Sequence, residues 1–292
     1  MEFAKAIVDG VLLGLIYGAV AAGFNVLFRA SKIPNLAQGQ LVMLGAYFIW
    51  WLSSFGLSPV YSFLAGIALT ALTAAIVGVV LFRPLMGRPV LTIAAAAIAL
   101  VGILHSLVLI AWGSTERAFP AIFDFAIFDF GGLRVDGTLA VGGLVCLAAV
   151  IAVAFYIEFS RRGQQVTAVA EDHVVAASLG VSLTNSMITG WLLSGGLAAV
   201  SAGALFSGHL LNPNIDQVGL RALPASLAAG LESIAFVPVT GIFIGISEVI
   251  AQRYLDARSS GMASLAMPYV VLLLIVIIRP QGIYGWKIND RV

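Results

Sequence analysis

The sequence has very little charge. Of its 292 residues, 10% are charged and 61% are hydrophobic, and the mean hydropathy is +1.05. Soluble domains carry about 25% charged residues. This chain has too few to cover a surface that faces water, so most of its exterior must face lipid. The formal net charge is only +1, which indicates neither a nucleic-acid partner nor an acidic interaction tail.

Other absences narrow the chemistry. The single cysteine, Cys146, lies in an apolar run, which excludes an internal disulfide and a cysteine-based metal cage and favours packing between helices. None of the lysines follows a glycine. The chain therefore lacks the GK[ST] phosphate loop and cannot hydrolyse nucleotides by that mechanism. HExxH and GxSxG motifs are also missing, so we expect no catalytic residues, no metal and no cofactor in this chain.

Apolar stretches recur along the whole sequence. A crossing helix needs about 20 apolar residues, and these runs lack the period-two alternation of barrel strands. We predict an all-α, polytopic helix bundle, a single domain over residues 1–292 with about eight crossings. The apolar region 222–251 is interrupted. It could form one span with a half-helix, or two short spans. The predicted spans are 7–28, 37–56, 60–82, 90–112, 138–158, 185–208, 222–251 and 264–278.

Basic residues in the short connections predict the orientation. Cytoplasmic loops carry an excess of Lys and Arg. Three connections are each separated from the next by two predicted spans, so they lie on the same side of the membrane. They hold Arg29 with Lys32, Arg83 with Arg88, and Arg161 with Arg162. Residues 159–184 would then form a cytoplasmic loop and 113–137 a periplasmic one, whose IFDFAIFDF pattern predicts a short hairpin or an amphipathic segment. The basic C-terminus also favours the cytoplasm, which requires two crossings in region 222–251.

Two polar stretches break otherwise apolar helices, SKIPNLAQGQ (31–40) and GLESIAFVPVTG (230–241). Broken helices at membrane depth are tolerated where they meet protein or water, and they often mark a transport path. In the second stretch, Glu232 beside Ser233 would face the path, cap a helix or lie at the interface. Glu248 would have a local partner near the membrane edge, and His105 would be a hydrogen-bonded packing residue rather than a proton relay.

Close helix packing and a cytoplasmic helix are also predicted. The GxxxG pairs of Gly14 with Gly18 and of Gly241 with Gly245 suit close backbone approach, in a static bundle or in an interface that moves. Residues 166–179 can form one amphipathic helix that stops at Gly180. This helix, with an exposed acidic pair at 171–172, would dock into a groove on a partner or form a solvated loop.

Four segments follow one another along the chain: GLIYGAVAAGFNVLFRASKIPNLAQGQLVMLGAY (14–47), AEDHVVAASLGV (170–181), LLSGGLAAVSAGAL (192–205) and RPQGIYG (279–285). In this order they resemble the LivH-like permeases of branched-chain amino-acid ABC importers. The resemblance implies a bacterial inner-membrane protein that pairs with a LivM-like sister permease, two cytoplasmic ATPases that use ATP, and a periplasmic substrate-binding protein.

The resemblance also assigns residues. It makes 170–181 the coupling helix seated on an ATPase, with Glu171, Asp172, Ala176 and Gly180. The candidates near the substrate path are Asn35, Gln38, Gln40, Glu232 and Ser233.

The sequence departs from this family at the predicted path. Gln38 and Gln40 stand where His and Glu are common, and Ala229 stands where Gly is expected. The solute could therefore be a related amino acid or a similar small molecule. The alternatives are a sugar permease of similar architecture and, from a different class, an ion-coupled secondary transporter with Glu232 and Glu248 as relay groups.

Overall fold

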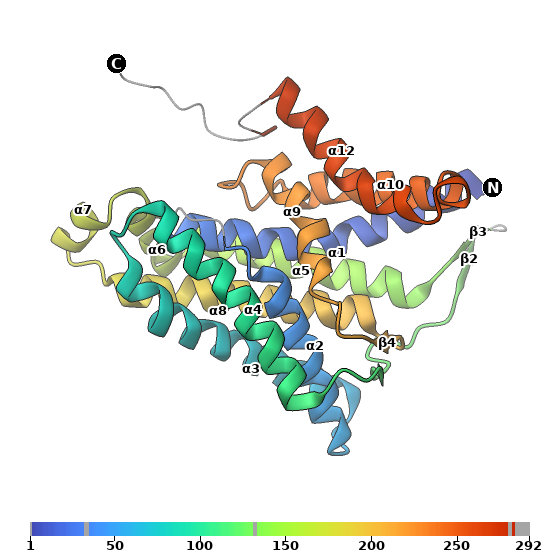
Figure 1. Cartoon of the computed structure of the whole chain (residues 1–292), viewed down its shortest axis with the longest axis horizontal. Coiled ribbons are helices and arrows are strands. Elements are labelled where there is room, and N and C mark those ends of the chain that lie inside the picture. Colours follow the sequence, from blue (N-terminus) through green and yellow to red (C-terminus); the bar gives the residue numbers. More distant parts are fainter. Residues whose placement is uncertain (1, 32–34, 131–132, 280–281, 284–292) are drawn as a thin grey trace.

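The structure is a bundle of helices with very little sheet (Figure 1). The computed structural model describes residues 2–31, 35–130, 133–279 and 282–283. The helices are α1 (Glu2–Ser31), α2 (Gln38–Ser54), α3 (Pro59–Val77), the π turn η1 (Gly78–Phe82), the 3₁₀ turn η2 (Arg83–Leu85), α4 (Val90–Trp112), α5 (Gly137–Phe159), α6 (Arg161–Glu171), α7 (His173–Ser178), α8 (Leu183–Phe206), α9 (Gln217–Ala229), α10 (Val237–Tyr254), α11 (Asp256–Ser259) and α12 (Met262–Ile278).

Several of these helices are long and apolar enough to cross a membrane. Among the described residues there are 5 such segments, namely α1, α3 with its extension to Leu85, α4 from Leu91, α5 and α8, and α12 is a shorter apolar helix. The predicted all-α membrane bundle is confirmed. Cys146 is buried and unpaired within α5.

The strands are short and lie in the connections. β1 (Arg117–Ala118) pairs antiparallel with β4 (Leu210–Leu211), and β2 (Phe128–Phe130) pairs antiparallel with β3 (Leu133–Val135). The second pair is a hairpin at the end of the IFDFAIFDF segment, so the hairpin alternative for that segment is confirmed.

Helix α1 packs against α5, α8, α9 and α10, and every residue from 14 to 27 is buried. Its GxxxG pair faces the pair on α10. A Cβ added to Gly14 would lie 2.5 Å from the Cα of Ile242, and one added to Gly245 would lie 2.3 Å from the carbonyl oxygen of Gly10. Helices in lipid associate through such close approach of small residues, so α1 and α10 form one tightly packed pair.

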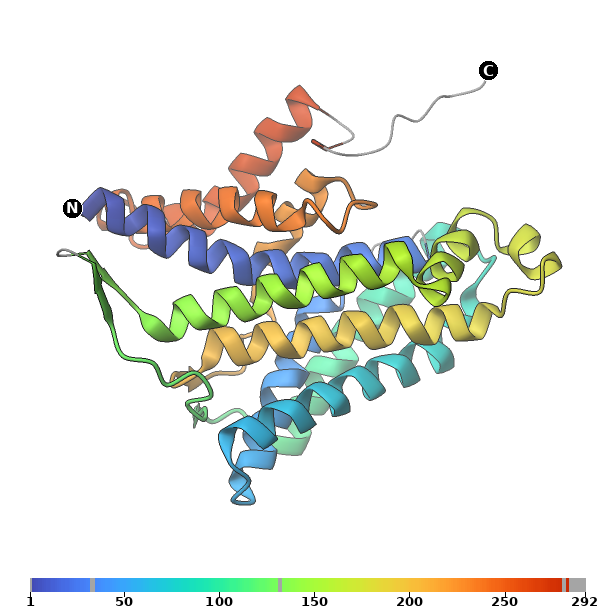
Figure 2. The same cartoon turned by 180° about the vertical axis from the view of Figure 1, so that it is seen from behind.

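Helix α8 builds the next layer, against α2 and α3. Figure 2 shows α1 (blue), α5 (green), α8 (gold) and α3 (teal) stacked in that order. Small residues again allow the contact, since a Cβ added to Gly45 of α2 would lie 2.8 Å from the Cα of Ala199 on α8.

The basic connections lie together at one end of the bundle (Figure 1). Arg29, near the end of α1, contacts Glu158, near the end of α5, at 3.4 Å, and α6 packs on α1, α5 and α8. The chain also returns here after α12, because the Ile283 N–H donates to the carbonyl of Ala228 at 2.8 Å. The C-terminal part of the described chain therefore lies at the end that holds the basic residues.

Both predicted breaks are interruptions of helix. α1 ends at Ser31 and α2 begins at Gln38, while residues 32–34, with the predicted Lys32, lie outside the described residues. α9 ends at Ala229 and α10 begins at Val237. The second break is shorter than predicted, because residues 237–241 are already helical. Pro238 lies in the first turn of α10, where its missing N–H removes no helical hydrogen bond.

Helix α9 is a half-helix. It has 13 residues and is thus roughly 20 Å long, against the ~30 Å of a hydrocarbon core. Its first turn packs against the start of α2, where a Cβ added to Gly39 would lie 2.2 Å from the carbonyl oxygen of Asp216. Because α9 begins at Gln217, the predicted start of this region at residue 222 is wrong by about a turn.

Candidate functional site

The three candidates at the start of α2 are all buried. Gln38 links α2 to α8, because its Nε2 donates to the Ser194 carbonyl at 3.3 Å and its Oε1 accepts from the Ser194 hydroxyl at 2.7 Å. Asn35 accepts from the Ala37 N–H at 3.1 Å, which fixes the turn that leads into α2. Gln38 therefore joins two helices, whereas Asn35 bonds locally and its buried Nδ2 has no hydrogen-bond partner among the described residues.

Gln40 belongs to a second polar group. Its Nε2 donates to Oδ2 of Asp216 at 3.1 Å, and Nδ1 of His105 on α4 lies 3.1 Å from the same oxygen. A carboxylate only accepts hydrogen bonds, so His105 must donate from Nδ1. The group joins α2 and α4 to the residue that precedes α9. His105 is therefore hydrogen-bonded, as the packing interpretation predicts.

Asn25 of α1 organises the break between α9 and α10. Its Nδ2 donates to the carbonyls of Gly230 at 3.2 Å and Ser233 at 2.6 Å, and its Oδ1 accepts from the Ser226 hydroxyl. The break leaves both carbonyls outside a helix, and an unpaired carbonyl in a membrane would be costly. The Gly230 carbonyl also accepts from the Ser233 N–H at 2.9 Å, so the Asn25 amide and this turn together satisfy the broken backbone.

A cavity of about 560 Å³ opens beside this break, between α5 and residues 232–236. Its polar lining includes both signs of charge, from Arg29, Glu158 and Glu232, together with Ser233. Its apolar lining comes mainly from α5, including Val150, Ile151, Ala154, Phe155 and Phe159. The cavity can therefore accept a small molecule that carries charges of both signs and an apolar group.

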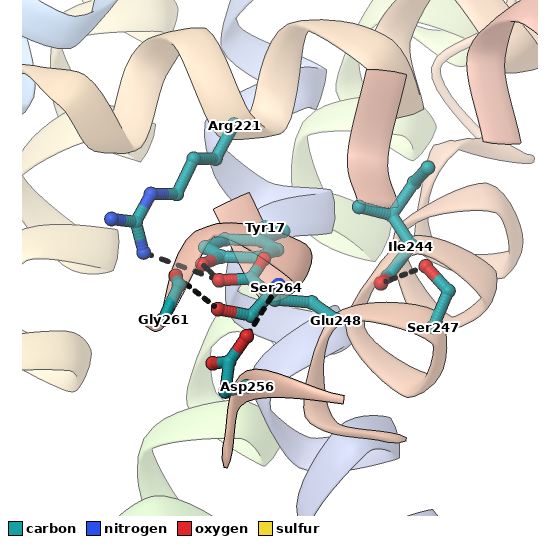
Figure 3. A network of polar contacts seen from close by, with 8 residues as sticks. All are labelled: Tyr17, Arg221, Ile244, Ser247, Glu248, Asp256, Gly261 and Ser264. Carbon is teal, nitrogen blue, oxygen red and sulfur yellow. Dashed lines mark hydrogen bonds and ion pairs between the residues drawn. The ribbon is translucent and has the colours of Figure 1, made fainter. Parts of the chain in front are cut away.

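An ion pair lies inside the bundle where α1, α9 and α10 meet (Figure 3). Arg221 of α9 contacts Oε1 of Glu248 at 3.2 Å, and the Tyr17 hydroxyl donates to the same oxygen at 3.1 Å. The Glu248 side chain is 7% exposed and that of Arg221 31%. The expectation of a local partner for Glu248 is wrong, because its partners come from α1 and α9.

The turn between α10 and α12 is fastened by another carboxylate. Asp256 accepts from the Ser264 N–H at 2.9 Å (Figure 3). Hydrogen bonds from the Ser264 side chain and backbone hold the pKa of Asp256 below its usual range. Asp256 therefore stays ionised at neutral pH and anchors the first turn of α12.

The predicted single helix over residues 166–179 is wrong. The segment forms α6 and α7, separated at Asp172, whose backbone is extended. Asp172 caps α7 by accepting from the N–H groups of Val174 at 2.9 Å and Val175 at 3.0 Å. An uninterrupted helix cannot supply this cap, because a capping residue takes a non-helical conformation.

Helix α7 presents its apolar side chains outward. Val174, Val175 and Leu179 are exposed, Leu179 by 78%, whereas Ala176 is buried. Gly180 ends the segment with a φ of 82°, a conformation that favours glycine. The result is a short apolar projection at the basic end of the bundle.

Comparison with known proteins identifies the family. Residues 6–278 match the family described as branched-chain amino acid transport system / permease component. The chain belongs to this permease family. It is 26% identical over 308 residues to the high-affinity branched-chain amino acid transport system permease protein LivH of Escherichia coli K12, covering 100% of this chain and 98% of that protein.

Two further relatives cover nearly the whole permease. BraD of Pseudomonas aeruginosa, a high-affinity branched-chain amino acid transport system permease protein, is 26% identical over 311 residues, 100% of this chain and 98% of BraD. A probable branched-chain amino acid transport permease protein LivH of Methanocaldococcus jannaschii is 29% identical over 310 residues, 99% of this chain and 95% of that protein. The chain is the permease component of an ABC importer.

The predicted path residues of the permease fall into two groups. Glu232 and Ser233 line the cavity, whereas Asn35, Gln38 and Gln40 surround the start of α2, in contacts with α8 and with the residue before α9. The structure does not bring the two groups into one site.

Among the polar residues of these networks that the sequence does not reveal are Asn25, Asp216, Arg221 and Tyr17. Asn25 is a single amide in an apolar helix, so it belongs to no motif. The available signal is that any polar group at membrane depth needs a partner. Asp216 and Arg221 precede residue 222, where the predicted interrupted region begins, so that prediction does not include them. Tyr17 carried no signal of its own, since a tyrosine in an apolar helix is common at interfaces.

Proposed function

We propose that this permease moves branched-chain or related small amino acids across the bacterial inner membrane, and that ATPases on separate chains drive it. The names of its relatives support the solute class, and the cavity at the α9–α10 break carries the proposal. A free amino acid has a carboxylate and an ammonium group, so its site needs both signs of charge, and a branched side chain needs an apolar wall.

The cavity offers these three features. Arg29 would hold the carboxylate, because a guanidinium binds carboxylates with paired donors. Glu158 and Glu232 would meet the ammonium group, and the apolar face of α5, with Ile151 and Phe155, would accept the side chain. Since Arg29 and Glu158 already contact each other at 3.4 Å, the amino acid would separate an existing pair rather than meet two unpaired charges.

The polar groups along α9 form the rest of the proposed path. Asp216, the residue before α9, is bound to Gln40 and His105, and residues 232–236, which follow α9, line the cavity. The N-terminus of a half-helix favours an anionic group such as a carboxylate. We therefore keep Gln40, Glu232 and Ser233 on the path, and assign Gln38 to joining α2 with α8 and Asn35 to the turn before α2.

Coupling to ATP is assigned to α6 and α7. The exposed apolar side chains of α7 would enter a groove on an ATPase subunit, with Asp172 as the cap that keeps α7 folded. Glu171, Ala176 and Gly180 would shape the same projection. ATP would be bound and hydrolysed by these partner subunits alone, and this chain would need no cofactor of its own.

The remaining partners follow from the importer class. A LivM-like sister permease would complete the transmembrane pathway, two ATPases would bind at the basic end, and a periplasmic binding protein would deliver the solute at the opposite end. Membrane lipid would cover the remaining apolar surface, and no nucleic acid is involved.

Reconstitution tests the proposal. The complete complex in proteoliposomes should take up leucine, isoleucine or valine when ATP and a binding protein are supplied, and an uncoupler should leave that uptake intact. A hexose in the same assay serves as the comparison. Uptake of the hexose alone would overturn the amino-acid assignment. Uptake by the isolated chain that collapses with the uncoupler would favour the ion-coupled carrier.

The cavity is tested by one pair of variants. Arg29→Ala should abolish leucine uptake, because it removes the proposed carboxylate partner. Arg134→Ala is the matched control, since Arg134 is 75% exposed in the hairpin and is not one of the residues that line this cavity. Equal uptake by the two variants would remove the cavity from the path.

A further inference from the structure

Two buried donor atoms at the other end of the bundle have no partner. Among the described residues, the hydroxyl of Tyr47 on α2 and Nε of Arg117 on β1 are both shielded from solvent and make no hydrogen bond. Both side chains lie against Trp50 and Trp112. Buried polar atoms nearly always have a partner, and each exception requires an explanation.

Aromatic rings enclose these atoms. The guanidinium of Arg117 lies 5.1 Å from the ring centroid of Trp50, and the ring of Tyr47 lies 5.6 Å from that of Trp112 and 6.4 Å from that of Trp50. The rings come from the second half of α2 and the last residue of α4. The β1–β4 pairing holds Arg117 against them.

Part of Arg117 already has a structural role. Its Nη2 donates to the Trp112 carbonyl at 3.3 Å, which satisfies one of the free carbonyls at the end of α4. That role does not use Nε. This position therefore has one N–H donor and one O–H donor without a partner, beside one positive charge. No carboxylate of the described residues bonds to either donor.

We propose that Tyr47 and Arg117 form a binding site for an oxyanion, either the carboxylate of the transported amino acid or the phosphate of a phospholipid headgroup. Both groups accept several hydrogen bonds, and both are attracted to a guanidinium. The carboxylate source rests on the proposed function, since an amino acid would pass this end of the bundle on entry. The phosphate source does not, because Trp, Tyr and Arg side chains at helix ends commonly lie at headgroup level.

Conservative variants test the two donors. Tyr47→Phe removes only the hydroxyl, and Arg117→Lys keeps the charge but loses Nε together with the Nη2 bond to the Trp112 carbonyl. Tyr61→Phe is the matched control, because Tyr61 is 67% exposed. Each variant is purified as the complete complex, and its ATP hydrolysis and elution profile show that it has assembled.

The experiment measures binding of two probes to complexes in nanodiscs. Tryptophan fluorescence, to which Trp50 and Trp112 contribute, follows titration with leucine and with leucinamide, which lacks the carboxylate. Native mass spectrometry measures retained phosphatidylglycerol against a glycolipid without phosphate. An oxyanion site predicts that one of the two probes binds on the order of tenfold more weakly to Tyr47→Phe and to Arg117→Lys, with Tyr61→Phe unchanged.

The outcomes identify the source. Leucine binding that depends on Tyr47, with no response to leucinamide, supports the carboxylate. Retention of the phosphate lipid that depends on Tyr47 supports the headgroup. If neither probe responds to either variant, the proposal is overturned, and the two atoms are hydrated only. Failure of the proposed function would instead appear as absent amino-acid uptake by the wild-type complex.

Discussion

A Cβ added to Gly14 of α1 would lie 2.6 Å from the carbonyl oxygen of Gly241 on α10, so the two backbones touch with no side chain between them. Gly245 repeats this contact one turn further along α10, against Gly10 and Gly14. The close contact of α1 with α10 is therefore set by glycines, and α10 begins directly after the break beside the cavity.

Enlarging this contact should destabilise the fold. Gly14→Ala should lower the free energy of unfolding by about 1–3 kcal/mol, because the added methyl group meets backbone that must move away. Gly102→Ala in α4 is the control, since a Cβ there has nothing within 4 Å and alanine favours a helix. Unfolding in mixed detergent micelles measures both. Equal stability of the two variants would contradict the close packing.

Removing the amide of Asn25 should weaken the break between α9 and α10. Asn25→Ala removes the amide donor from the Ser233 carbonyl, while the Gly230 carbonyl keeps its bond from the Ser233 N–H at 2.9 Å. The lost bond costs about 1–3 kcal/mol. It should also reduce uptake, because residues 230–236 border the cavity. Asn185→Ala is the control, since Asn185 is exposed near the start of α8. Normal stability and uptake of Asn25→Ala would show that the break holds itself in place.

Removing one member of the internal ion pair should lower the free energy of unfolding more than replacing both members with apolar side chains. Glu248→Ala leaves Arg221 without its partner. Losing one member of a buried pair costs about 3–5 kcal/mol, which the partial exposure of Arg221 reduces to about 2 kcal/mol.

A double-mutant cycle checks this ion pair. The Arg221→Met, Glu248→Leu double variant should recover most of the lost stability, because no uncompensated charge remains. If the free energy of unfolding that the double variant loses equals the sum of the losses of the two single variants, the two side chains do not interact in the folded protein.

The sequence predicts the parts of this fold that depend on local composition. Length and apolarity set the spans, and the polar stretches at 31–40 and 230–241 set the breaks, because both signals are contained within a few turns of chain. The partners of the polar groups could not be predicted. Gln40 and Asp216, or Asn25 and Ser233, are more than 170 residues apart, and only the packing of α1, α2 and α9 brings them together.

The split between α6 and α7 is a different case, because a local signal existed. Asp172 precedes the apolar run His173–Ala177, and aspartate strongly favours the N-cap position. Apolar periodicity alone cannot show this, since it continues across the cap. The exposed side chains of α7 follow from the split, because the new helix direction turns them away from the bundle.

That exposed surface of α7 leads to the last prediction. Leu179→Asp should prevent the ATPase subunits from co-purifying and should abolish uptake, because a charge placed in an apolar docking groove loses its hydration without gaining a partner. Folding should be unaffected, since Leu179 makes little contact within the chain. Gln165→Asp on the exposed face of α6 is the control for added charge at this end of the bundle. Co-purification measured by affinity capture should separate the two variants. Retention of the ATPases by Leu179→Asp would move the coupling surface away from α7, and the charge reversal Glu171→Lys would then test α6 in the same assay.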